Sequence, residues 1–385
     1  MRTMRTTAHH DPSCRAAREP AGSPRGTDRV VAPARPSPRA VTATLGVIWL
    51  VDGVLQLQPS MFSTSFATGT LAGAGAGQPW WVLHSVAHLA HDLAPHIAQW
   101  NVVFALVQLA IGACLVANRR VRPALAASVA WSLGVWWFGE GFGGIFSGRA
   151  SLVTGAPGAV LLYGLLAVLV WPRRHGRATA TSAAGPAPTG PGASVTGAGI
   201  AGAAAGRAAW VVLWVGGALL QVLPANRSDA AVSSAIRGGA AGEPHALASL
   251  ATAAAHLVGT RGAAAAIALA VAEAAIGVGV LARRPNVALA AGIAASLVFW
   301  VVGQQLGGIL TGSGTDPNAG PLFVLLALAL WQGVPVGARA RAQARARARD
   351  DGDGDGDGGG HSDGDDSSAG RAPEAGARPG VPAGV

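Results

Sequence analysis

Apolar segments separated by short polar ones make up most of the chain between residues 41 and 332. Several reach the about 20 residues with which a helix crosses the hydrocarbon core of a bilayer. The first is shorter and carries Asp52 near its middle. This pattern predicts an all-α integral membrane protein with eight transmembrane helices. We expect these helices at residues 41–58, 100–117, 123–141, 155–171, 210–223, 262–282, 286–306 and 320–331.

One sequence motif occurs twice, each time at the end of an apolar run. Residues 131–148 read WSLGVWWFGEGFGGIFSG, and residues 296–312 read SLVFWVVGQQLGGILTG. Both stretches contain Ser-Leu, a Trp, a Gly, a polar residue, Gly-Gly-Ile and a closing Gly. The register holds over a longer distance, because Gly112 and Gly277 lie in the same Ala-Ile-Gly triplet 165 residues apart. The repetition predicts an internal duplication.

The duplication divides the membrane part into two four-helix repeats at residues 41–171 and 207–334. A Gly-, Ala- and Pro-rich linker at residues 172–206 joins them. A unit of four helices returns the chain to the side on which it started. The repeats are therefore predicted to be parallel, related by an axis along the membrane normal.

The placement of Arg predicts the orientation of the chain. All 28 basic residues are Arg, and most lie in the tails, the linker and the short loops at 119–122 and 283–284. With eight helices these segments share one side of the membrane, which the positive-inside rule assigns to the cytoplasm. We therefore expect a multi-pass protein of the cell membrane with both termini cytoplasmic. The exceptions in the opposite loops are Arg149, Arg227, Arg237 and Arg261.

Composition agrees with a membrane protein whose ends are polar. Only 12% of the residues are charged, against about 25% in soluble domains. Residues 1–40 and 335–385 lack apolar periodicity and are expected to be disordered. The Arg-rich run at 339–349 is a candidate for contact with anionic lipid. The bilayer is thus the expected partner, and the net charge of +9 gives no reason to expect nucleic acid.

Three acidic residues fall inside or at the edge of the expected helices, namely Asp52, Glu140 and Glu273. An ionised side chain at the centre of a membrane helix costs about 2.5–3.5 kcal/mol, so such residues usually face the protein interior and have a function. The aligned positions exchange acid for amide, since Gln108 matches Glu273 and Gln304 matches Glu140. We predict that these five residues line a polar path between the repeats. Ordinary hydrogen bonds between helices are the alternative.

A second group of polar residues precedes the second expected helix. His84, His88 and His91 are spaced by four and three residues, so a single helical face presents all three. Such a face can bind zinc or copper through imidazole nitrogens. A surface helix that turns its polar face to water is the alternative, and the weak retention of these residues in the second half favours it.

The segments DGVLQLQP at 52–59 and WWFGEGFGGIF at 136–146, together with the doubled four-helix unit, resemble uncharacterised multi-pass membrane proteins of high-GC bacteria. This resemblance implies a membrane fold and no particular activity or cofactor. Residues 139–144 also match G-x-G-x-x-G, but an apolar helix precedes them, whereas a dinucleotide site needs a strand.

Two functional classes remain from the sequence. The first is a transporter or channel-like protein that uses the polar path. The second is a non-transporting membrane component, such as a redox- or quinone-associated subunit or an envelope scaffold. The chain contains no nucleophile elbow, P-loop or pair of neighbouring thiols, so enzymatic activity is the less favoured expectation.

Overall fold

The computed structural model describes residues 36–172 and 202–333, which belong to one compact unit that ends at Val336. The described residues form helices and turns, with no strand. The expected disordered tails and most of the linker, with the Arg-rich run at 339–349, lie outside the described residues.

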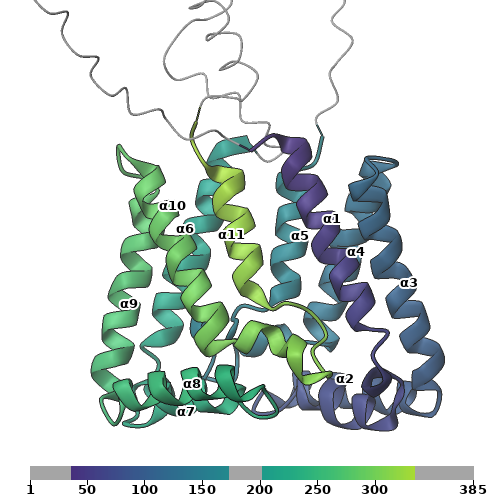
Figure 1. Cartoon of the computed structure of the whole chain (residues 1–385), viewed down its shortest axis with the longest axis horizontal. Coiled ribbons are helices and arrows are strands. Elements are labelled where there is room, and N and C mark those ends of the chain that lie inside the picture. The colour runs from purple at the N-terminus through teal and green to yellow at the C-terminus, as the bar shows by residue number, and fades with distance from the viewer. Residues whose placement is uncertain (1–35, 173–201, 334–385) are drawn as a thin grey trace, which may run out of the picture. The chain divides into compact units, whose positions relative to one another are not determined.

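Five helical stretches of the described chain are long and apolar enough to cross a membrane. This finding confirms an all-helical membrane protein in outline (Figure 1). The five are α1 (Pro38–Leu55), the stretch Trp80–Val116 that holds α2 (Trp80–Leu93) and α3 (Ile97–Val116), α6 (Gly202–Gln221), α9 (Gly262–Gly279), and α10 (Pro285–Val298) with its extension η7 (Phe299–Gly303).

Three further helices run alongside these five, as Figure 1 shows. They are α4 (Val121–Phe138), α5 (Ala159–Leu169) and α11 (Ala319–Leu330). The helix α5 begins four residues later than the sequence suggested, because Gly155 and Gly158 adopt positive φ angles that a helix does not contain. The total of eight membrane helices stays a prediction.

The start of α1 shows how the sequence sets a helix boundary. The hydroxyl of Ser37 accepts a hydrogen bond from the backbone N–H of Ala40, and Pro38 occupies the first helical turn. Both features stabilise a helix N-terminus. Leu45, Trp49 and Asp52 then follow at helical spacing and are all buried on one face.

Glycines allow α1 and α3 to pack closely. A Cβ atom added at Gly46 would lie 2.9 Å from the carbonyl oxygen of Gly112, and one added at Gly112 would lie 2.7 Å from that of Gly46. Small residues at such contacts are typical of membrane helices, whose backbones approach closely. The contact fixes α1, and hence Asp52, relative to α3.

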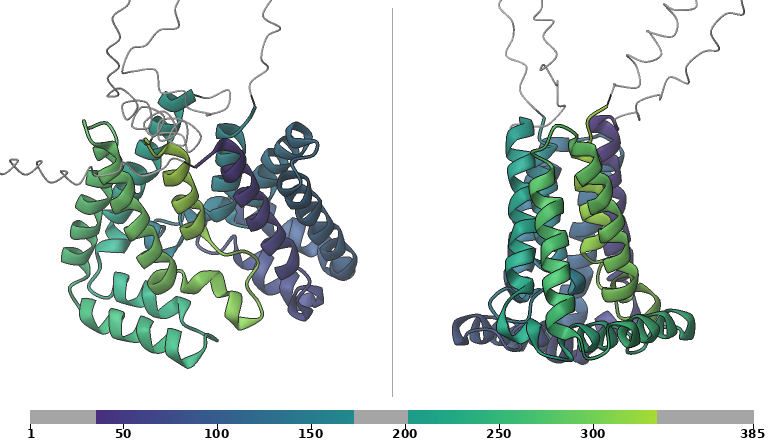
Figure 2. Two further views of the ribbon diagram at one scale, coloured as in Figure 1. Left: turned by 45° about the horizontal axis from the view of Figure 1, so that its top comes forward. Right: turned by 90° about the vertical axis from the view of Figure 1, so that its left-hand side faces the viewer.

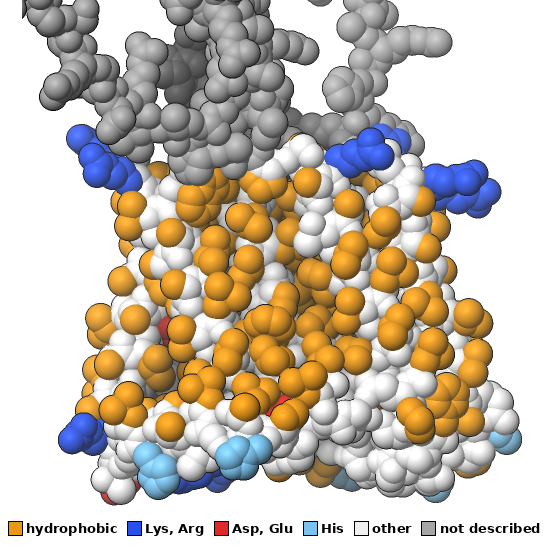
Figure 3. Space-filling view, viewed as in Figure 1, with side chains coloured by type: hydrophobic (Ala, Val, Ile, Leu, Met, Phe, Trp, Pro, Cys, Tyr) orange, Lys and Arg blue, Asp and Glu red, His pale blue; other side chains and the backbone are white. Residues whose placement is uncertain are grey.

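The helices α2, α7 (Ala231–Gly239) and α8 (His245–Val258) lie across one end of the upright helices (Figures 1 and 2). Exposed apolar side chains mark them, including Trp80 at 73% and Leu257 at 81% exposure. Figure 3 shows an apolar band across the middle of the molecule, with basic side chains at both ends and mostly at the end opposite α2, α7 and α8. This is the distribution expected where a bilayer surrounds the helices and aromatic residues lie at its surface.

One apolar core runs through both halves of the described chain. Trp49 stacks at a tilt on Tyr163, with ring centroids 4.4 Å apart, in the first half. Trp214 and Phe323 meet edge to face at 5.5 Å in the second half and belong to the same core. The helix α11 contacts both α1 and α5, so the two halves share a continuous interface.

Candidate functional site

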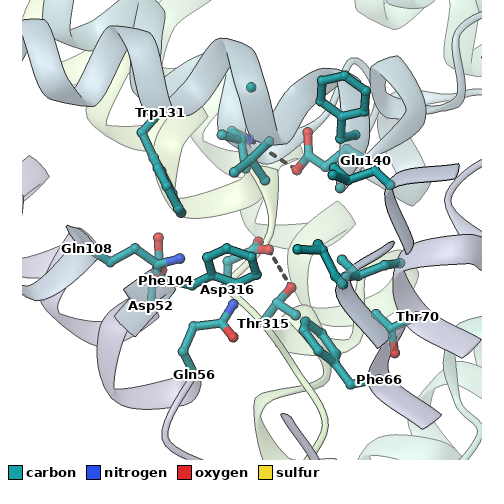
Figure 4. Close-up of a pocket in the computed structure, with 18 of the residues that line it drawn as sticks. Asp52, Gln56, Phe66, Thr70, Phe104, Gln108, Trp131, Glu140, Thr315 and Asp316 are labelled. Carbon is teal, nitrogen blue, oxygen red and sulfur yellow. Dashed lines mark hydrogen bonds between the residues drawn. The ribbon is translucent and has the colours of Figure 1, made fainter. Parts of the chain in front are cut away.

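A cavity of about 270 Å³ lies within the first half of the chain. The helices α1, α3 and α4 form its walls, and residues of α2 and of the π-helical segment η2 (Phe66–Leu71) close it near the surface that α2 covers. Figure 4 shows side chains from these elements pointing toward one another around it. Its main polar lining residues are Asp52, Gln56, Gln108, Glu140, Thr315 and Asp316.

Asp52 places a carboxyl group on the buried face of α1, where it is only 3% exposed. Its Oδ1 atom makes no hydrogen bond among the described residues, and neither does the buried hydroxyl of Tyr163 that lies beside this carboxyl group. The carbonyl oxygens of the Gln56 and Gln108 side chains, also buried, lack a partner there too. Unpaired buried polar atoms are costly, so these three acceptors identify a site that a ligand or water would satisfy.

Glu140 is held just beyond the end of α4. Its Oε1 atom accepts a hydrogen bond from the backbone N–H of Val160 at 3.1 Å, in the first turn of α5. A carboxylate is favourable there, because the unpaired N–H groups of a helix N-terminus carry partial positive charge. Its Oε2 atom has no partner in the described structure. One oxygen therefore anchors the side chain, and the other lies against the backbone at Gly158, while Glu140 as a whole belongs to the lining of the cavity.

The turn that positions Glu140 depends on glycine. A Cβ atom on Gly158, whose φ is +108°, would lie 2.2 Å from Oε2 of Glu140. Nearby, the indole N–H of Trp136 donates to the carbonyl oxygen of Pro157 at 2.7 Å. Together these contacts bring the end of α4 against the start of α5.

Asp316 reaches the cavity from the other half of the chain. The hydroxyl of Thr315 donates to its Oδ2 atom at 2.8 Å, and the N–H of Asn318 donates to Oδ1 at 2.7 Å. Gln58 and Ser60 hold the loop in place, donating to the carbonyl oxygens of Gly314 and Gly312. Burial raises the pKa of the Asp316 carboxyl above its usual range, although the two hydrogen bonds act in the opposite direction.

The matching region of the second half is filled by apolar side chains. Gly217 lies 165 residues after Asp52, which is the offset of the predicted repeat, and it is so close to Leu152 that an added Cβ atom would be 2.4 Å from that side chain. Val153 approaches Gly303 in the same way and belongs to the apolar core beneath α7 and α8. A hollow of only about 10 Å³ remains beside Gln221. The large cavity therefore has no equivalent at this position.

The structure brings together three of the five residues predicted for the polar path. Asp52, Gln108 and Glu140 line the cavity. Glu273 and Gln304 do not: Glu273 is 1% exposed on α9, and Gln304 bonds to backbone atoms in the second half and at Leu152.

The three histidines predicted as metal ligands are exposed on α2. The Nδ1 atom of His84 lies 2.7 Å from the carbonyl oxygen of Trp80, within its own helix. Among residues 36–172 and 202–333, no group of three or more His, Cys, Asp and Glu side chains is placed to hold a metal ion. The spacing of His84, His88 and His91 thus puts them on one face without bringing them to one point.

Sequence reasoning missed Asp316 and the aromatic part of the lining. The one local signal for Asp316 is an Asp-Pro-Asn triplet directly before the last apolar run. Nothing in that triplet shows that the loop crosses onto the first half. The lining aromatic residues are Trp49, Phe66, Phe104, Trp131 and Phe138, and in the sequence they look like ordinary core or membrane-surface residues.

The charge of the cavity limits what it can bind. It holds three carboxyl groups, and none of the described residues that line it is Arg, Lys or His. Such a site attracts protons and other cations and repels anions. Protein-family models, curated proteins and solved structures give no match to the chain. The function is therefore inferred from the chemistry of this cavity.

Proposed function

We propose that the chain is a transporter or channel-like protein of the cell membrane that exchanges a cation against protons at the cavity of its first half. The observation that carries this proposal is the buried Asp52 carboxyl, which faces a cavity and has an unpaired oxygen. A cation that enters favours the carboxylate, so binding and proton release are coupled.

The proposal includes two parallel repeats of four membrane helices each. Two pairs of hydrogen bonds support it. The indole N–H of Trp300 donates to Pro317 as that of Trp136 donates to Pro157. The backbone N–H of Gly320 donates to Oε1 of Gln304, as Val160 donates to Glu140. Backbone turns at positive φ follow in both copies, at residues 141–144 and 305–308.

The orientation in the proposal places the Arg-rich end in the cytoplasm. In Figure 1, α1 and α6 begin, and α11 ends, at the end opposite α2 and α8. The predicted Arg loops at 119–122 and 283–284 follow α3 and α9 at that same end. By the positive-inside rule this end faces the cytoplasm. The cavity, which α2 and η2 help to line, then lies near the outer surface.

A flux experiment tests the proposal. The full chain is reconstituted in liposomes that contain a pH-sensitive dye, and Na⁺, K⁺ or choline is added outside. Exchange makes the interior more alkaline as protons leave. We expect Asp52→Asn to abolish this response, since its side chain cannot release a proton, and Glu273→Gln to preserve it.

Two results would contradict parts of the proposal. Equal losses in both variants would favour a path between the halves that includes Glu273. No proton movement with any cation, from protein that is folded and correctly inserted, would exclude exchange and favour a non-transporting membrane component.

A further inference from the structure

Five aromatic side chains line the same cavity as the three carboxyl groups. Trp49 lies on α1, the helix that also carries Asp52. Phe104 comes from α3 and Trp131 from α4, and the rings of Phe104 and Trp131 meet edge to face with centroids 5.7 Å apart. Figure 4 shows Trp131, Phe104 and Phe66 around the space that Asp52 and Glu140 also face. The wall of the cavity thus combines negative charge with aromatic surface.

This combination selects among cations. A ring face attracts an ammonium group through its quadrupole, most strongly where water is excluded. A small metal ion instead needs several oxygen ligands around one point. The described residues provide no such convergence of three acidic or His side chains. The volume of about 270 Å³ is far larger than the about 10–15 Å³ of such space that holds one water molecule, and it exceeds what a bare metal ion needs.

We propose that the cavity binds a small organic cation, an ammonium group that carries apolar substituents. This inference rests on the proposed function and names its substrate class. Asp52, Glu140 and Asp316 supply the opposite charge, and the rings of Trp49, Phe104 and Trp131 contact the substituents. A neutral apolar molecule of the same size would leave these carboxyl groups without an opposite charge, whereas the positive charge of the ammonium group also attracts the buried, unpaired carbonyl oxygens of Gln56 and Gln108.

The source of the ammonium group is a free cation rather than a phospholipid. A headgroup such as phosphocholine would carry its phosphate into a site where none of the described lining residues is basic. An unpaired phosphate beside three carboxyl groups is strongly unfavourable. Free ammonium compounds avoid this conflict.

Binding of choline, compared with 3,3-dimethylbutan-1-ol, tests the inference. The second compound has the shape of choline with carbon in place of the charged nitrogen. The purified full chain in nanodiscs made only of phosphatidylglycerol is titrated with each, and affinity is read by calorimetry. We expect choline to bind at least tenfold more tightly. Equal affinities, or choline binding that Na⁺ displaces at similar concentrations, would overturn the inference.

Variants show whether the cavity is responsible. Asp52→Asn should weaken choline at least tenfold and leave the weak binding of the neutral analogue unchanged, which excludes simple misfolding. Trp131→Leu should weaken choline by about two- to thirtyfold, and Trp131→Phe by less. Glu273→Gln, another buried acid changed to an amide, should have no effect. Unchanged choline affinity in both Asp52→Asn and Trp131→Leu would place the site elsewhere.

A last experiment tests whether the site binds a lipid headgroup or a soluble cation. Nanodiscs with added phosphatidylcholine should bind free choline as tightly as those without it, and competition by the lipid would show a headgroup site instead. The outcomes also distinguish this inference from the proposed function. Proton exchange with Na⁺ alone would preserve the function and reject the organic cation. Choline binding without proton exchange would preserve the organic-cation site and reject the proposed transport function.

Discussion

Gln304 and Leu152 join the two halves of the chain through one hydrogen bond, in which Nε2 of Gln304 donates to the carbonyl oxygen of Leu152 at 3.1 Å. A glutamate could not make this bond, because a carboxylate has no N–H group. At the position that the predicted repeat aligns with Gln304, Glu140 accepts a bond from the next helix, and its second oxygen has no partner among the described residues. The exchange of amide for acid therefore replaces a bond between the two halves with a bond inside the first half.

Glu140→Gln tests the two roles of this side chain separately. The amide oxygen can still accept from the N–H of Val160, so the thermal unfolding temperature should change little. Glu140→Ala removes the acceptor and should destabilise the protein by about 1–3 kcal/mol. Both variants should weaken cation binding, because both remove the charge. Thermal unfolding followed by Trp fluorescence, together with calorimetric binding, distinguishes them; equal stability of the two variants would show that the bond to Val160 contributes nothing.

Gly158→Ala should disturb the site through the backbone. The φ of +108° is disfavoured for alanine, and the added Cβ atom would overlap Oε2 of Glu140. A penalty of at least about 1–3 kcal/mol is expected, together with loss of cation binding. Gly216→Ala is the matched control, because it lies on α6 with no other group within 4 Å of the new atom. Unfolding measurements should show no loss for the control, and similar stability of both variants would refute the strain at Gly158.

The fold was predictable to the extent that it follows from local pattern. Apolar runs predicted the long helices, and the cost of a charge in the membrane made Asp52 a candidate site residue. Asp316 could not be found in this way. Its place at the cavity depends on bonds from Gln58 and Ser60 to a loop more than 250 residues away, and no periodicity records such a contact.

The sequence also showed no sign that Leu152 and Val153 pack into the second half of the chain. Leu152 and Val153 lie in a short polar-flanked segment that looks like any surface loop. Their burial becomes visible only when the loop packs against Gly217 and Gly303. The predicted alignment of the halves indicated where charge differs, but it could not indicate that apolar side chains fill the region around Gly217.

A double-mutant cycle at Gly217 and Leu152 tests whether these two residues pack against each other. Gly217→Ala alone should destabilise the protein, because the new methyl group would overlap the Leu152 side chain. Leu152→Ala alone should cost about 2–5 kcal/mol through the space that it leaves. The double variant should be less unstable than the sum, with a coupling of about 0.5–3 kcal/mol. Additive effects in thermal or urea unfolding would mean that the two residues do not share this contact.

The pH dependence of cation binding follows from Asp316. Burial raises the pKa of this carboxyl, so part of the population carries a proton at pH values where an exposed aspartate would be fully ionised. A bound cation favours the ionised form, and binding therefore releases protons. Affinity for choline should rise with pH, by up to about tenfold per pH unit for each linked proton, and level off above the raised pKa. Asp316→Asn removes one of the three carboxyl groups of the cavity, so it should make the profile less steep as well as weaken binding at high pH. Calorimetry in buffers of different ionisation enthalpy counts the protons directly, and an affinity that falls as pH rises would exclude the linkage.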